Sequence, residues 1–136
     1  IAFSNSSVTL IHGMSRPIGA LYHVPHGLSN SMLLPEITAW SVTGAPERYA
    51  HCARHMGMAE GSDTGTIALE KLVGALRQLN LDGSVPTPKE YGIDEAAWFE
   101  SLDLMADQAL ASGSPGNNPL IPVAADIVDL YRRVWS

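Results

Sequence analysis

Apolar side chains recur at three- and four-residue spacing, and this pattern most narrows the folds open to the chain. The clearest stripe follows the i, i+3, i+4, i+7 spacing of a helix with one buried face. Its members are Leu69, Leu72, Val73, Leu76 and Leu79. No stretch alternates apolar and polar residues over six positions, as a half-buried strand would. The sequence therefore predicts an all-α protein.

The same spacing predicts a bundle of about six helices. Ser62 and Asp63 are expected to cap the helix of the stripe, and Asp82-Gly83 to end it. Pro35 is expected to kink its helix or to begin a new helical segment. The expected helices cover residues 2–14, 28–40, 46–56, 63–80, 93–111 and 122–135.

Length and composition indicate one globular domain over residues 1–136. With 46% hydrophobic and 16% charged residues, the chain can bury a core. A net charge of -6 without any basic run excludes a nucleic-acid or anionic-membrane surface. The apolar runs are far shorter than a transmembrane helix, which needs about 20 apolar residues. Cys52 is the one cysteine and cannot form an internal disulfide, so we expect a cytoplasmic protein.

The first residues, IAFSNSSVTLIHGM, contain no initiator methionine and no charged leader, and a helical pattern is already in progress. We therefore expect the 136 residues to be a piece of a longer protein. A processed or re-engineered N-terminus is the alternative.

The segment 12–35 is the richest in chemistry, because it holds three of the five histidines. Neutral imidazole is a common ligand of iron, zinc and related divalent metals. On one straight helix His12 and His26 would lie about 21 Å apart. Two ligands of one ion must lie within roughly 3–4 Å of each other. A shared metal therefore requires a break between the two histidines.

The intervening residues supply breaking signals. Pro17 and Gly19 are expected to end the first helix, and Pro25 to precede His26 at the start of the next. Two histidines do not complete a metal site, which takes three or more protein ligands. From the residues alone, hydrogen-bonded core or surface histidines stay open as the alternative.

The segment resembles the metal-binding signature of the iron-containing (group III) alcohol dehydrogenase family. In that signature a histidine and a glycine-rich turn precede Pro-His-Gly and Leu-Pro. The upstream AFSNSSVTLIH and the later KEYGI are also similar to the family, so the resemblance spans nearly the whole chain. The matching residues are His12, Gly19, Pro25-His26-Gly27, Leu34-Pro35 and Asn118-Pro119.

The resemblance implies that His12 and His26 are the last two of four metal ligands. The other two, an Asp and a His, belong to an earlier helix that this chain lacks, as it lacks the nucleotide-binding α/β domain. The chain then corresponds to an N-terminally truncated helical domain of the dehydroquinate synthase-like type. No cofactor-binding residue is expected within it, and no residue is assigned to acid–base catalysis.

For the complete protein the resemblance implies hydride transfer between NAD or NADP and an alcohol, with an aldehyde or ketone as product. A divalent metal, Fe²⁺ or alternatively Zn²⁺, would act as Lewis acid. The expected substrates are small alcohols and aldehydes or hydroxy and oxo acids, and a homo-oligomer is left open. The fragment alone is expected to be inactive.

Two positions depart from the family pattern. Arg16 stands where many members have a second histidine, and it cannot act as an acid or base near neutral pH. Arg16 and His23 are predicted to line the substrate pocket, with a salt bridge and a loop hydrogen bond as the respective alternatives. Leu120 stands where the family has an arginine, so any role of that arginine is not expected in this chain.

Two other functions compete with this prediction. One is a maleylacetate reductase-like or zinc-dependent glycerol dehydrogenase-like enzyme of the same superfamily. The other is a non-catalytic helical interaction module. His51 and His55 stand four residues apart and are expected on a solvated helix face. The remaining unusual side chains are expected in the core: Trp40, Cys52, Trp98 and Trp135.

Overall fold

A computed structural model describes residues 2–44, 46–57, 59–61, 64–113 and 121–136, with side chains from residue 10 onward except 43, 48 and 52. All regular structure within these residues is helical, which confirms the all-α prediction. The elements are α1 (Ala2–Tyr22), α2 (His26–Ser41), the 3-10 turn η1 (Val42–Gly44), α3 (Pro46–His55), α4 (Gly65–Asp82), α5 (Pro88–Tyr91), α6 (Glu95–Glu100), α7 (Leu102–Ala111) and α8 (Ala124–Val134). None of these helices is long and apolar enough to cross a membrane.

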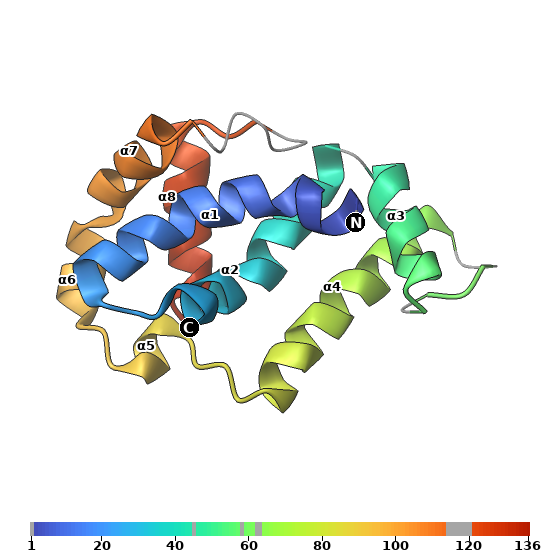
Figure 1. Cartoon of the computed structure of the whole chain (residues 1–136), viewed down its shortest axis with the longest axis horizontal. Coiled ribbons are helices and arrows are strands. Elements are labelled where there is room, and N and C mark those ends of the chain that lie inside the picture. The colour runs from blue at the N-terminus through green and yellow to red at the C-terminus, as the bar shows by residue number, and fades with distance from the viewer. Residues whose placement is uncertain (1, 45, 58, 62–63, 114–120) are drawn as a thin grey trace.

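The first helix, α1, lies between the two ends of the molecule (Figure 1). It packs against α2 and α7, and α8 packs against α7 and α2. The pair α3 and α4 forms the opposite end, where α4 contacts α2. Two apolar clusters follow this division, one mainly among α1, α2 and α6–α8 and one mainly between α3 and α4. The helices that carry His12 and His26 are thus held on several sides.

Trp98 lies at the centre of an aromatic cluster in the larger core. Its side chain is fully buried, and its ring centroid lies 5.7 Å from those of Tyr22 and Trp135 and 5.8 Å from that of Tyr131. Trp135 is also buried, and Trp40 is half-buried against the same core. The prediction that the three tryptophans belong to the core is confirmed.

The first helix is longer than its sequence suggests. The expectation that Pro17 and Gly19 end it is wrong, because α1 continues to Tyr22. A proline inside a helix removes one hydrogen bond and costs about 3 kcal/mol. Pro17 is itself buried, and Met14, one turn earlier, and Ile18, the next residue, are fully buried. Each such apolar side chain contributes about 1.5–3 kcal/mol. Burial on both sides of Pro17 therefore outweighs the break.

The single helix expected over 93–111 is divided at Ser101 into α6 and α7. The hydroxyl of Tyr22 donates to the carbonyl of Ala97 at 2.9 Å and lies 2.6 Å from the hydroxyl of Ser101. A tertiary contact from the end of α1 thus occupies the point of division. Together with the four-residue α5, this division accounts for eight α-helices in the described residues against about six expected.

Other helix ends follow the sequence more closely. Thr64 caps α4, since its hydroxyl accepts from the N–H of Ile67 at 3.3 Å. The predicted caps Ser62 and Asp63 lie outside the described residues. Gly83 ends α4 as expected. Pro35 does not begin a new segment, because α2 continues through it.

Tyr131 gives the fold an alkaline sensitivity that can be tested. Its hydroxyl is buried and donates to the carbonyl of Met14 at 2.6 Å, and burial raises the pKa of Tyr131. The unfolded chain ionises this group first, near pH 10, so the free energy of unfolding should fall as the pH rises above about 10. We expect a smaller fall in Tyr131→Phe than in the exposed control Tyr91→Phe, measured by urea unfolding. Equal falls in the two variants would contradict the role of Tyr131.

Candidate metal centre

A tight turn between α1 and α2 places His26 at the start of a helix. His23 adopts a left-handed conformation (φ 56°), and its N–H donates to the carbonyl of Gly19 at 3.0 Å, which closes the end of α1. Pro25, with φ -53° and ψ 142°, immediately precedes α2. The chain reverses within three residues, and His26 is the first residue of α2.

This reversal brings His12 of α1 and His26 of α2 together. Their ring centroids lie 5.1 Å apart with an interplanar angle of 78°, an edge-on arrangement. Two imidazoles that bind one ion tetrahedrally at about 2.1 Å through nitrogen have centroids roughly 5 Å apart. The pair therefore fits two ligands of one metal ion, as the spacing argument required.

The two histidines differ in exposure. His12 is half-buried and His26 is exposed. A cavity of about 160 Å³ opens beside His12. The described residues contain no group of three or more histidine, cysteine, aspartate or glutamate side chains arranged for a metal. If His12 and His26 bind one ion, at least one further ligand has to come from elsewhere. The cavity is lined by Ile11, His12, Asn30, Ser31 and Leu34.

Asn30 is a residue of this site that the sequence analysis missed. Its side-chain Nδ2 lies 3.2 Å from Nε2 of His26, one helical turn earlier on α2. The spacing of four residues between His26 and Asn30 was the available signal, since such pairs share one face of a helix.

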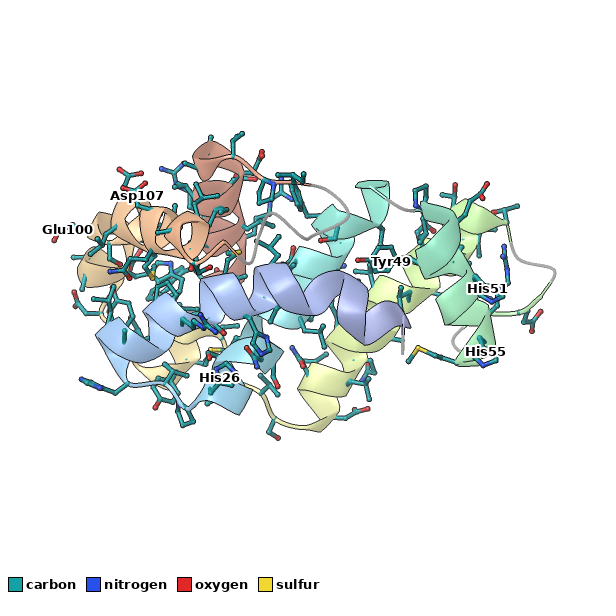
Figure 2. All side chains as sticks on the ribbon, turned by 45° about the horizontal axis from the view of Figure 1, so that its top comes forward. His26, Tyr49, His51, His55, Glu100 and Asp107 are labelled. Carbon is teal, nitrogen blue, oxygen red and sulfur yellow. The ribbon has the colours of Figure 1, made fainter. Side chains whose placement is uncertain are left out.

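The second histidine pair lies far from this centre (Figure 2). His51 and His55 are on α3, at the opposite end of the molecule from His26. Both are exposed, and their rings stack with centroids 6.2 Å apart. The prediction of a solvated helix face is confirmed.

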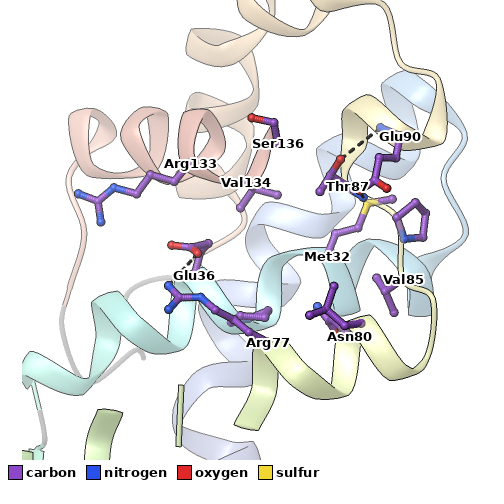
Figure 3. Close-up of a pocket in the computed structure, with 13 residues that line it drawn as sticks. Met32, Glu36, Arg77, Asn80, Val85, Thr87, Glu90, Arg133, Val134 and Ser136 are labelled. Carbon is purple, nitrogen blue, oxygen red and sulfur yellow. Dashed lines mark hydrogen bonds and ion pairs between the residues drawn. The ribbon is translucent and has the colours of Figure 1, made fainter. Parts of the chain in front are cut away.

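A larger cavity of about 330 Å³ lies among α2, α4 and α8 (Figure 3). Its charged side chains are engaged with one another or with neighbours. Arg77 pairs with Glu36 at 3.0 Å, and Arg133 pairs with Asp129 at 2.8 Å. Glu90 caps α5 through Thr87. Because its charged side chains are already paired, this cavity is a weaker candidate for a functional site than the pair of histidines.

Comparison with known proteins gives the family of the chain. The model of the family "Fe-containing alcohol dehydrogenase family, C-terminal" matches residues 1–135. The chain belongs to the iron-containing alcohol dehydrogenase family. Its homologues are alcohol dehydrogenases, and it corresponds to a C-terminal fragment of them.

Individual relatives support the assignment of the chain to this family. It is 33% identical to lactaldehyde reductase of Escherichia coli (strain K12) over 99% of the chain and 35% of the relative. It is 32% identical to NADPH-dependent butanol dehydrogenase of Clostridium saccharobutylicum over 88% of the chain and 30% of the relative. A crystal structure of 1,3-propanediol oxidoreductase superposes with a TM-score of 0.83 at 28% identity, over 92% of the chain and 32% of that protein. The chain thus spans about a third of the length of these relatives.

The other residues that the sequence predicted for the site are placed as follows. Arg16 lies on α1 one turn after His12 and is exposed, and His23 is exposed in the turn before α2. A role of either in the substrate pocket stays a prediction. Asn118, Pro119 and Leu120 lie outside the described residues, as does the side chain of Cys52.

The left-handed conformation of His23 gives a test of the turn. Such a conformation costs a residue with a Cβ about 1–2 kcal/mol, whereas glycine adopts it freely. We expect His23→Gly to raise the free energy of unfolding by up to about 1 kcal/mol, measured by urea denaturation. His23→Val, with a branched Cβ, should lower it. Destabilisation by glycine would show that the imidazole itself stabilises the turn.

Proposed function

We propose that the complete protein is a metal-dependent NAD(P)-linked alcohol dehydrogenase, and that this chain supplies part of its metal and alcohol site. The observation that carries the proposal is the edge-on pair of His12 and His26, 5.1 Å apart between centroids. It supports a role for both as ligands of one divalent ion.

In the proposed enzyme the ion, when bound, supplies Lewis-acid polarisation of the alcohol or carbonyl oxygen. The residues of this chain hold and orient it. His12 is held on α1 between buried neighbours, and His26 projects from the first turn of α2. Both imidazole ligands are thus carried by helices of one packed core, which limits movement of the site.

The partners and setting of the complete enzyme also belong to this proposal. NAD or NADP and the remaining ligands would be bound by parts of the protein outside these residues, so the 136-residue chain alone would be inactive. Relatives named for lactaldehyde, butanol and 1,3-propanediol favour small alcohols and aldehydes as substrates. Arg16 would favour a substrate with a carboxylate. We propose a cytoplasmic enzyme and leave open whether it forms a homo-oligomer.

Removal of the metal from the complete protein tests the function. Treatment with a chelator should abolish NAD(P)-dependent alcohol oxidation, and Fe²⁺ or Zn²⁺ should restore it, because two imidazoles suit either ion. The measurement is NAD(P)H absorbance with a panel of small alcohols, and the ion that restores most turnover identifies the metal. Full turnover of verified metal-free protein would refute the proposal.

A further inference from the structure

We propose that Asn30 is a positioning residue of the metal centre: its side-chain amide fixes the orientation of the His26 imidazole toward His12. This inference rests on the proposed function above. The 3.2 Å contact between Asn30 Nδ2 and His26 Nε2 joins two side chains on successive turns of α2. The Nδ2 atom can only donate, so in this contact Nε2 accepts. A His26 that binds an ion through Nδ1 carries its proton on Nε2, and a half-turn of the Asn30 amide then presents Oδ1 as the acceptor of that proton.

His26 needs such support because of its place in the fold. Its side chain is exposed at the first turn of α2, where little packing restricts it. The terminal torsion of histidine is broad and roughly two-fold, so an unsupported ring can turn and present the other edge. A fixed ring lowers the entropy lost on metal binding, and outer partners of ligand histidines are worth ten- to hundredfold in metal affinity.

The second atom of the amide points to the same role. Asn30 Oδ1 is buried and has no hydrogen-bond partner among the described residues. The side chain also lines the 160 Å³ cavity beside His12. A buried polar atom left without a partner usually reflects a functional requirement or a missing water or ion. Asn30 thus contacts one histidine and faces the cavity of the other.

The backbone around Asn30 is itself anchored. Asn80 of α4 donates from Nδ2 to the carbonyl of Ser31 at 2.7 Å, which ties this turn of α2 to a neighbouring helix. The backbone that carries Asn30 is therefore held in place, which a residue that orients another side chain requires.

The test compares metal affinities of the metal-free complete protein. Zn²⁺ and Co²⁺ are titrated in competition with a chromophoric chelator, and the visible spectrum of the Co²⁺ form is recorded. Asn30→Leu keeps the size of the side chain and removes its hydrogen bonds, whereas Asn30→Asp keeps an oxygen acceptor. Gln78→Leu is the matched control, because Gln78 donates from its amide to Asp82 at the same four-residue spacing on α4.

We expect Asn30→Leu to lose roughly tenfold or more in affinity with an altered Co²⁺ spectrum. Asn30→Asp should retain both, and Gln78→Leu should match the wild type. Thermal unfolding of each metal-free variant separates a fold defect from loss of the site. Wild-type affinity and spectrum in a folded Asn30→Leu variant would overturn the inference, as would an equal loss in Asn30→Asp. A wild-type protein that binds no metal would instead refute the proposed function.

Discussion

His26→Ala in the complete protein is expected to lower metal affinity by at least about a hundredfold, since a lost ligand exceeds the ten- to hundredfold effect of an outer partner. Alcohol oxidation should fall with it, because the remaining ligands no longer retain the ion at ordinary concentrations. The measurements are metal content after dialysis and kcat/KM at saturating NAD(P). The His12→Ala variant should behave in the same way.

His51→Ala is the matched control for this prediction. It removes an exposed imidazole that also has a histidine neighbour, but on α3 at the other end of the molecule. Metal content and turnover should match the wild type. If His26→Ala and His51→Ala both kept the wild-type metal content, the histidine pair between α1 and α2 would not be the metal centre.

Trp98→Ala is expected to destabilise the chain by about 3–5 kcal/mol, the usual cost of deleting a buried tryptophan. The side chain is fully buried and contacts three other aromatic rings, so its loss leaves a large cavity. Because domains are stable by only about 5–15 kcal/mol, much of the population should unfold in mild urea. The measurement is the urea midpoint from circular dichroism.

The neighbouring residue provides the comparison for Trp98. Phe99 contacts Trp135 but is 40% exposed. Phe99→Ala should therefore cost clearly less than Trp98→Ala, because less area leaves contact with the core. An equal loss in the free energy of unfolding for the two variants would mean that Trp98 is no more important to stability than its exposed neighbour.

Local sequence patterns were sufficient to predict the all-α class and the start of α2, which is one side of the turn between α1 and α2. Apolar spacing predicted α4 and α8, and the glycine after Asp82 marked the end of α4. Pro25 correctly marked the start of α2 at His26. These signals depend on residues within one or two turns of each other, so they can be read without knowledge of the fold.

Tertiary contacts decided the rest. Pro17 stays within α1 because the core buries the nearby Met14 and Ile18. Ser101 divides α6 from α7 where Tyr22 reaches it from 79 positions away. The sequence by itself determined which imidazoles were available, and that the chain must turn between them if both bind one ion. Their 5.1 Å approach was decided by the packing of α1 against α2, because long-range burial outweighs local helix preference.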